Sequence, residues 1–338
     1  MTALVVAGET VVRGTRVDLF PTVSESYTGA RTHIPMTVLH GVEPGPRVFV
    51  TAAVHGDELN GAATCQELLS VLDPDELRGV LIVVPIVNVL GAQIHSRYLP
   101  DRRDLNRSFP GTTSGSMASR MARVIMDEVV RGSDVGIDLH TAANRRTNIP
   151  QLRVQTSDER AVELAMAFGP PYILDAANRP GSLREVATSE GVRVLTYEGG
   201  EPLRFDPEAI EVALNGTLRL LDHLGMRDSG PPPPSQPPLV MHESRWIRAE
   251  RGGILELHAE PGDAVTVGQP LWTTTTPLGM ERSTVESPYD AVVIGGTTVP
   301  LVAPGDAVLH LGLPGEREPV EDDPSAEEDA LAIPPDIS

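Results

Sequence analysis

The 338-residue sequence contains no lysine, and all 27 of its lysine-plus-arginine residues are arginine. Lysine-tethered biotin or lipoate, Schiff-base catalysis and the phosphate-binding lysine of P-loop enzymes are therefore excluded. Cysteine is almost absent as well. The single cysteine, Cys65, cannot form an intrachain disulfide, which agrees with a reducing compartment. We interpret Cys65 as a small core residue of a helix.

Long apolar runs and an excess of positive charge are also missing. No run approaches the roughly 18 apolar residues that a membrane helix needs, and the first residues lack the basic region of a signal peptide. The net charge of −20 argues against binding to nucleic acid or to anionic membranes. The sequence therefore predicts a cytoplasmic protein with small-molecule partners, and leaves homo-oligomer formation open.

Apolar runs of strand length alternate with segments of helical periodicity over the first two thirds of the chain. We predict helices at 59–72, 116–131, 158–168, 182–189 and 207–224, and strands at 9–20, 33–40, 48–54, 80–87, 135–139, 152–155, 172–174 and 193–197. The alternation favours an α/β fold, in which a mostly parallel mixed sheet is covered by helices. We assign residues 1–228 to this domain.

The last third of the chain has a different composition. Residues 229–239 are rich in proline, which predicts a stiff linker. Residues 240–313 contain short β runs separated by Gly-Asp and Gly-Gln turns, which predict a small all-β, barrel-like domain. Residues 314–338 are acidic and rich in proline and alanine, which predicts a disordered tail.

Polar clusters follow three of the predicted core strands, and a fourth cluster lies in an arginine-rich loop. The three strand-end clusters are His55-Gly56-Asp57-Glu58, Asp138-Leu139-His140-Thr141 and Tyr197-Glu198-Gly199-Gly200. The loop carries Asp104-Leu105-Asn106-Arg107-Ser108-Phe109-Pro110-Gly111. Because the carboxyl ends of parallel strands lie along one edge of a sheet, the strand-end clusters could meet in space.

These clusters contain the residue types of a hydrolytic zinc site. Two imidazoles and a carboxylate, from His55, His140 and Glu58, suit Zn²⁺ and leave a fourth position for water. Bound zinc lowers the pKa of that water to about 7 and polarises a carbonyl oxygen. Glu198, not needed as a ligand, could take the water proton and pass it to a leaving nitrogen.

The pair Asn106-Arg107 supplies an amide and a bidentate guanidinium group, which suit a substrate carboxylate. Taken singly, such a pair is typical of a surface turn, and a histidine at a strand end is more often structural. The joint occurrence of the four clusters, in this order and in an α/β context, indicates a catalytic site.

The same motifs resemble a known family. His55-x-x-Glu58, Asn106-Arg107, His140 and Glu198 are similar to the layout of M14-type zinc carboxypeptidases. The longer clusters resemble the succinylglutamate desuccinylase/aspartoacylase family over roughly residues 40–225. This resemblance implies a zinc carboxypeptidase-like fold and one zinc ion per chain. It assigns the zinc to His55, Glu58 and His140, the role of general base to Glu198, and the substrate carboxylate to Asn106 and Arg107.

The resemblance also implies roles for two further arginines. Arg97, upstream of the Asn-Arg pair, resembles the arginine that polarises the scissile carbonyl, and Arg102 and Arg103 are rivals for that role. Arg184 resembles a further carboxylate-binding arginine. The arginine-rich loop and the segment at 143–148 would favour an acidic ligand if they line the pocket, while exposure to solvent explains them equally well.

The β domain resembles half of a biotinyl/lipoyl-type barrel, on residues 262–271 and 287–293. An attachment lysine would be expected near Gly279-Met280-Glu281, and none is present. A covalent-carrier role is therefore excluded. Capping of the active site and contact with another subunit both stay open for this domain.

The predicted function is a zinc-dependent amide hydrolase that removes an acyl group from an N-acyl amino acid or a related small carboxylate. The alternative is a metallocarboxypeptidase that trims a C-terminal residue from a peptide or conjugate, since both reactions cleave an amide near a free carboxylate. A non-catalytic zinc- or ligand-binding relative is disfavoured, because the ligands and the base are all present. The sequence does not specify the acyl group or the amino acid.

Overall fold

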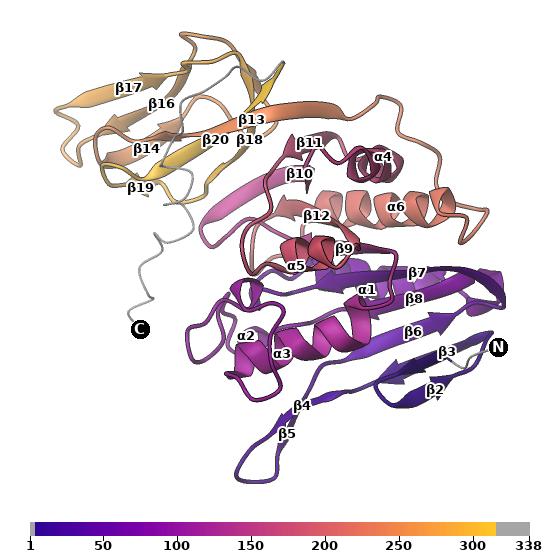
Figure 1. Cartoon of the computed structure of the whole chain (residues 1–338). Coiled ribbons are helices and arrows are strands. Elements are labelled where there is room, and N and C mark those ends of the chain that lie inside the picture. The colour runs from indigo at the N-terminus through magenta and orange to yellow at the C-terminus, as the bar shows by residue number, and fades with distance from the viewer. Residues whose placement is uncertain (1–3, 316–338) are drawn as a thin grey trace.

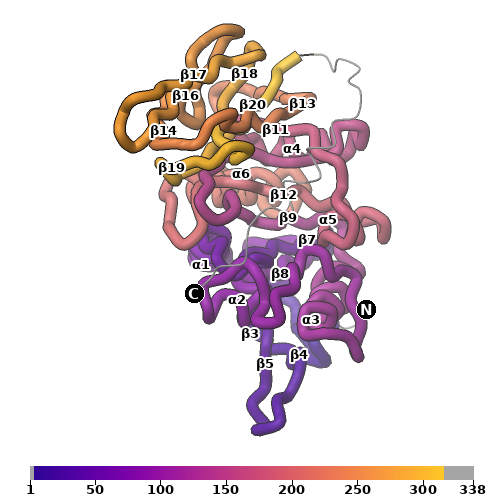
Figure 2. Tube along the Cα trace, turned by 90° about the vertical axis from the view of Figure 1, so that its left-hand side faces the viewer, coloured from indigo at the N-terminus to yellow at the C-terminus, as the bar shows by residue number. Residues whose placement is uncertain are grey.

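The structure, a computed structural model, describes residues 4–315, so most of the predicted tail lies outside the described residues. Near the N-terminus, β1 (Leu4–Val6) pairs with β2 (Glu9–Val11). The hairpin of β4 (Thr22–Glu25) and β5 (Arg31–His33) projects from the body of the molecule (Figure 2).

The middle of the main sheet is parallel. β7 (Glu43–Ala52) pairs in parallel with β8 (Arg78–Val84) and with β9 (Val135–His140), and β12 (Arg193–Gly200) extends this set beyond β9. At the outer edge, β6 (Met36–His40) and β3 (Thr15–Leu19) add antiparallel strands. The central strands are continuous apolar runs because both of their faces are buried.

Helices cover both faces of this sheet (Figure 1). One apolar core joins the sheet to α1 (Asn60–Val71), α4 (Glu159–Phe168) and α6 (Pro207–His223). The other core lies under α3 (Met117–Ile125), its π-helical continuation Met126–Val130, and α5 (Leu183–Ser189). A short helix not predicted from the sequence, α2 (Val89–Gln93), begins in the loop after β8.

The sheet continues beyond β12 through strands that the sequence only partly predicted. β10 (Arg146–Val154) is antiparallel to β12 and begins well before the predicted strand at 152–155. β11 (Tyr172–Asp175) is parallel to β10, and β13 (Leu239–Arg248), which follows the proline-rich segment, is parallel to β11. The fold is thus mixed α/β, as predicted, but its parallel pairs are interrupted by antiparallel ones.

The C-terminal part is built onto this extension. β13 pairs with β20 (Ala307–Pro314), β20 pairs with β18 (Ala291–Thr297), and β18 pairs with β10, so these strands and β11 close a ring. β15 (Ala264–Val265) adds to β18. A second sheet contains β17 (Arg282–Glu286), β16 (Pro270–Thr275), β14 (Gly253–Leu257) and β19 (Leu301–Val302). Within residues 4–315, no helix is long and apolar enough to cross a membrane.

Candidate functional site

The turn after β7 carries His55 and Glu58, and close packing fixes its path. Ala53, at its start, has a φ of 49°, in the left-handed region that is unfavourable for a residue with a Cβ atom. A Cβ atom at Gly56 would lie 2.2 Å from the backbone nitrogen of Ala92, so only glycine fits there. The two polar side chains therefore leave the end of β7 along a single, well-defined backbone path.

The Glu58 carboxylate lies between two imidazoles. Nδ1 of His55 is 2.7 Å from Oε1, and Nδ1 of His140 is 2.8 Å from Oε2. All three side chains are buried, and their ligand atoms lie within 4.8 Å of one another. His55 Nε2 is buried without a hydrogen-bond partner. The three residues that the sequence predicted as metal ligands are thus brought together in a geometry that could hold a metal ion.

The charges of this cluster shift the pKa values of its members. Burial alone would raise the pKa of the Glu58 carboxyl, but His55 and His140 lower it well below its usual range. Burial alone would lower the pKa of His140, but Asp138 and Glu58 raise it well above the usual value. Burial and the charge of Glu58 raise the pKa of Asp57 to about 6. The Glu58 carboxylate is therefore held in its ionised form.

Two aspartates to which the sequence analysis gave no role support the cluster. Asp138 accepts hydrogen bonds of 2.8 Å from His140 Nε2 and from the Thr51 hydroxyl. The alternation of side chains along a strand places Asp138 and His140 on the same face, and this signal was available in the sequence. Asp104 Oδ2 lies 3.3 Å from Arg97 Nη2, and Asp104 Oδ1 lies 3.3 Å from His55 Nε2 without hydrogen-bond geometry.

Arg97 is the arginine that the structure places at the cluster. Its Nη1 lies 3.2 Å from Glu58 Oε1. Its two rivals are exposed to solvent, and Arg103 forms an ion pair with Asp101, with Nε 3.2 Å from Oδ2. Of the three arginines considered for the scissile carbonyl, Arg97 alone contacts a candidate ligand.

Glu198 lies at the end of β12, directly opposite His140 in the neighbouring strand β9. Its Oε2 accepts a hydrogen bond of 3.1 Å from Nδ2 of Asn148, and Arg153 Nη1 lies 3.7 Å from its Oε1. The candidate base and the candidate metal ligands therefore share one edge of the sheet, as the strand-end argument predicted.

The pair Asn106-Arg107 forms a 3₁₀ turn that faces the start of α5. Asn106 Oδ1 accepts a hydrogen bond of 2.9 Å from the backbone N–H of Leu183. Arg107 is exposed, and its Nη1 donates to the Asn106 carbonyl oxygen at 2.5 Å. The turn thus presents an amide and a guanidinium side by side.

Arg184, which the resemblance assigned to carboxylate binding, makes its hydrogen bonds to backbone carbonyl groups. Its guanidinium donates to the carbonyl oxygens of Arg153, Ala176 and Ala177, at distances of 2.6, 3.2 and 2.9 Å. Burial and the nearby charge of Arg153 lower its pKa to about 10. These contacts connect α5 to the strands beneath it.

Two arginines that the sequence analysis did not single out extend the basic character of the site. Arg153 lies in β10 beside Glu198, and Arg179 lies in the loop before α5. Partial desolvation and the charges of Arg153 and Arg107 lower the pKa of Arg179, which places three guanidinium groups within electrostatic range of one another. Such a set favours an anion.

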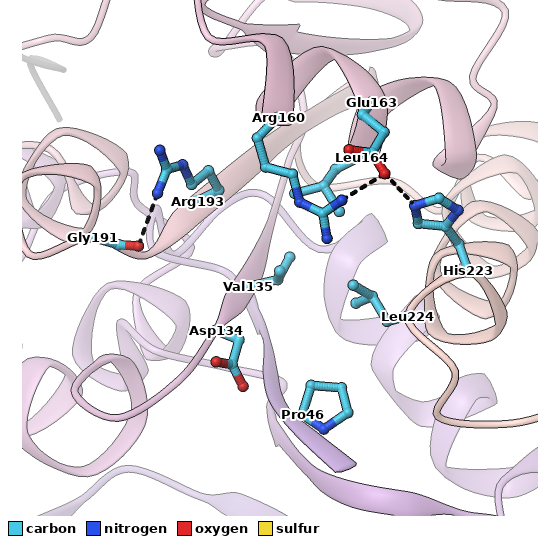
Figure 3. A pocket seen from close by; sticks show the side chains of 10 residues that line it. All are labelled: Pro46, Asp134, Val135, Arg160, Glu163, Leu164, Gly191, Arg193, His223 and Leu224. Atoms are coloured by element: carbon cyan, nitrogen blue, oxygen red, sulfur yellow. Dashed lines mark hydrogen bonds and ion pairs between the residues drawn. The ribbon is translucent and has the colours of Figure 1, made fainter.

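A cleft of about 590 Å³ elsewhere on the molecule has a different character (Figure 3). It is lined by Val135 and Arg193, where β9 and β12 begin, and so lies at the opposite edge of the sheet from His140 and Glu198. Its Glu163 is paired with Arg160 at 2.6 Å and with His223 at 3.1 Å. This cleft is therefore separate from the candidate site, which lies at the carboxyl ends of the strands.

Comparison with known proteins identifies relatives over this part of the chain. The sequence model of the succinylglutamate desuccinylase/aspartoacylase catalytic domain matches residues 44–224. The N-alpha-acetyl-L-2,4-diaminobutyric acid deacetylase of Halomonas elongata is 33% identical over 260 residues, which cover 72% of this chain and 74% of that protein.

Solved structures show the same fold. A succinylglutamate desuccinylase/aspartoacylase from Rhodobacter sphaeroides superposes with a TM-score of 0.80 at 25% identity, covering 89% of this chain and 96% of that one. The product-bound ectoine utilization protein EutE (DoeB) of Ruegeria pomeroyi gives a TM-score of 0.79 at 23% identity, covering 88% and 95%.

The chain belongs to the succinylglutamate desuccinylase/aspartoacylase family, which confirms the resemblance seen in the motifs. Its relatives place it among hydrolytic deacylases that cleave amides. The carboxypeptidase alternative is not favoured by these comparisons.

Proposed function

We propose that the protein is a zinc-dependent deacylase that hydrolyses the amide of an N-acyl amino acid or a related small carboxylate. The observation that carries this proposal is the buried cluster of His55, Glu58 and His140, with Glu198 on the adjacent strand. The deacetylase of Halomonas elongata supports a small N-acyl amino acid as the class of substrate.

The donor set fits zinc. Two imidazole nitrogens and one carboxylate oxygen are ligands that Zn²⁺ accepts, and three protein ligands leave a position for substrate or water. The ionised Glu58 carboxylate, which lies between the Nδ1 atoms of His55 and His140, suits a cation in this cluster. When bound, zinc would lower the pKa of a water molecule and polarise a carbonyl oxygen.

The chain's own residues would complete the reaction. Arg97, which lies beside Glu58, would donate hydrogen bonds to the carbonyl oxygen as negative charge develops there. Glu198 takes a proton from the attacking water and delivers it to the amide nitrogen as the C–N bond breaks. The products are a carboxylic acid and an amine, and the Glu198 carboxylate is regenerated.

The substrate carboxylate would bind at the turn of Asn106 and Arg107. The oxygen of the Asn106 amide is occupied by Leu183, which leaves its nitrogen to donate. The Arg107 guanidinium can bind a carboxylate in a bidentate manner, and Arg153 and Arg179 add positive charge nearby.

The test is a comparison of Glu198→Gln and His140→Ala with the wild-type protein. We expect Glu198→Gln to keep stoichiometric zinc and lose about 10²–10⁴-fold in turnover, the usual effect of removing a proton-transfer group. His140→Ala should lose zinc on elemental analysis. Glu211→Gln, on the exposed face of α6, is the matched control and should behave as wild type.

Turnover is measured as amine released from a panel of N-acyl amino acids and from short peptides. Unchanged turnover in Glu198→Gln would remove Glu198 from the mechanism. Stoichiometric zinc in His140→Ala would refute the ligand assignment. Turnover of the peptides alone would restore the carboxypeptidase alternative.

A further inference from the structure

A row of residues in register crosses from the α/β part into the C-terminal part beside Glu198. Asn148 of β10 lies opposite Gly295 of β18, and Gly295 lies opposite His310 of β20. His310 in turn lies opposite Trp246 of β13, and their rings stack with centroids 4.5 Å apart. The ring of strands therefore continues directly from the candidate active site into the C-terminal part.

Asn148 is the point at which this row meets the active site. Its side chain is buried, and its Nδ2 donates to Glu198 Oε2 at 3.1 Å. A carboxylate can only accept, so the amide nitrogen must face Glu198 and the amide oxygen must face away. Within the described chain, this is the hydrogen bond that holds the Glu198 carboxylate, since Arg153 is farther away at 3.7 Å.

Gly295 fixes the other side of the Asn148 amide. A Cβ atom at position 295 would lie 2.5 Å from Asn148 Oδ1 and 2.7 Å from the Thr147 carbonyl oxygen. Any side chain there would collide with β10 or displace the amide. The absence of a side chain at Gly295 lets β18 lie directly against Asn148 and confine it to the conformation that reaches Glu198.

The other charged groups around Glu198 cannot replace this contact. Arg153 and Arg179 attract the carboxylate at longer range, and Arg184 is bonded to backbone carbonyls. His140, on the adjacent strand, is bonded to Glu58 and Asp138. The Asn148 amide is neutral, and its N–H group points at one oxygen of the Glu198 carboxylate. It therefore orients the carboxylate without adding charge.

We propose that Asn148 is a positioning residue for Glu198, and that Gly295 of the C-terminal part holds Asn148 in place. This inference rests on the proposed role of Glu198 as the base. It makes the C-terminal β strands a component of the active site, because they fix the donor that aims the carboxylate.

The test uses the full-length, zinc-loaded protein and the variants Asn148→Ala, Asn148→Asp and Gly295→Ala. We expect each of these variants to lower kcat by about 10- to 100-fold, because each removes or displaces the hydrogen bond to the charged Glu198 carboxylate. KM and zinc content should stay within about twofold of wild type. Asn215→Ala, in α6 on the far side of the sheet, is the matched control, and melting temperatures report on folding.

A double-mutant cycle separates positioning from a general structural effect. In a Glu198→Gln background, Asn148→Ala should cost less than about threefold in residual kcat, because no carboxylate is left to position. The same fall in both backgrounds, or full activity in Asn148→Asp, would overturn the inference. If Gly295→Ala does not fold, the Asn148 variants decide. Failure of the wild-type protein to deacylate any substrate would overturn both proposals, whereas unchanged Asn148 variants of an active enzyme would overturn this one alone.

Discussion

Replacing Asp138 with asparagine tests whether a carboxylate behind His140 strengthens metal binding. The side chain of Asp138 is 1% exposed, and it accepts from His140 Nε2 and from Thr51 at 2.8 Å each. Asparagine keeps the shape. Its oxygen can still accept from His140, and its amide can donate to the Thr51 hydroxyl, so the main change is the loss of charge.

Replacing the hydrogen-bond partner of a metal-binding histidine typically weakens metal affinity by about 10- to 100-fold, or about 1.4–2.7 kcal/mol. We therefore expect Asp138→Asn to weaken zinc binding by that factor, measured by competition with a chromogenic chelator. Asp138→Ala also removes the hydrogen-bond acceptor and leaves the buried N–H of His140 Nε2 unpaired. This unpaired group should add about 1–3 kcal/mol to the loss of binding free energy.

The control is Thr51→Val, which removes one donor to Asp138 and leaves the bond to His140 intact. Its zinc affinity should change by less than about threefold. If Asp138→Asn binds zinc as tightly as wild type, the carboxylate does not tune the site. If Thr51→Val weakens zinc as much as Asp138→Asn does, the effect comes from packing rather than from charge.

Two further predictions concern stability and reactivity. Burial and the charges of Arg153 and Arg146 lower the pKa of His310 well below its ordinary value. Below about pH 6.5, His310 is therefore protonated in the unfolded state and neutral in the folded state. The free energy of unfolding should then fall by up to about 1.4 kcal/mol for each unit by which the pH decreases below about 6.5, because of this group. Urea titrations at pH 5–7 should show a smaller decrease for His310→Phe than for the wild-type protein. Equal slopes would contradict the assignment. Burial raises the pKa of the Cys65 thiol far above its usual value, so it should react with a thiol reagent in urea but not in the folded protein; rapid labelling of the folded protein would show that the site opens.

The parts of the site that follow core strands could be predicted from the sequence. His55, Glu58, His140 and Glu198 each follow or end a continuous apolar run, and the parallel pairing of β7, β9 and β12 brings those ends together. Asp138 could have been added by the same reasoning, because it shares a strand face with His140.

The parts that depend on pairing between distant segments could not be predicted. Residues 146–150 carry no apolar alternation and include Pro150, so β10 was expected to begin only at 152. Its first residues are held by β18, from the far end of the chain. In the same way, the proline-rich segment was expected to separate two domains, whereas the strand that follows it pairs with β11 in the same sheet.

Arg184 shows a different limit. Its distance along the chain from Glu198 suggested a role in carboxylate binding, but that spacing does not specify the direction of a side chain on a short helix. In the structure, its donors face carbonyl oxygens of β10 and of the segment after β11. Arg153, whose Nη1 lies 3.7 Å from Glu198 Oε1, occupies a position that no motif marked.

The closed ring of β10, β11, β13, β20 and β18 also has a consequence for the order in which the protein is made. Chains are synthesised from the N-terminus, and domains generally fold as they emerge. The strands that carry His55, His140 and Glu198 are complete by residue 200, whereas the partner of Asn148 belongs to a strand that ends at Thr297. A nascent chain can therefore bring its candidate metal ligands together once residue 200 has emerged, whereas the contact that supports the candidate base forms only after residue 297 has emerged.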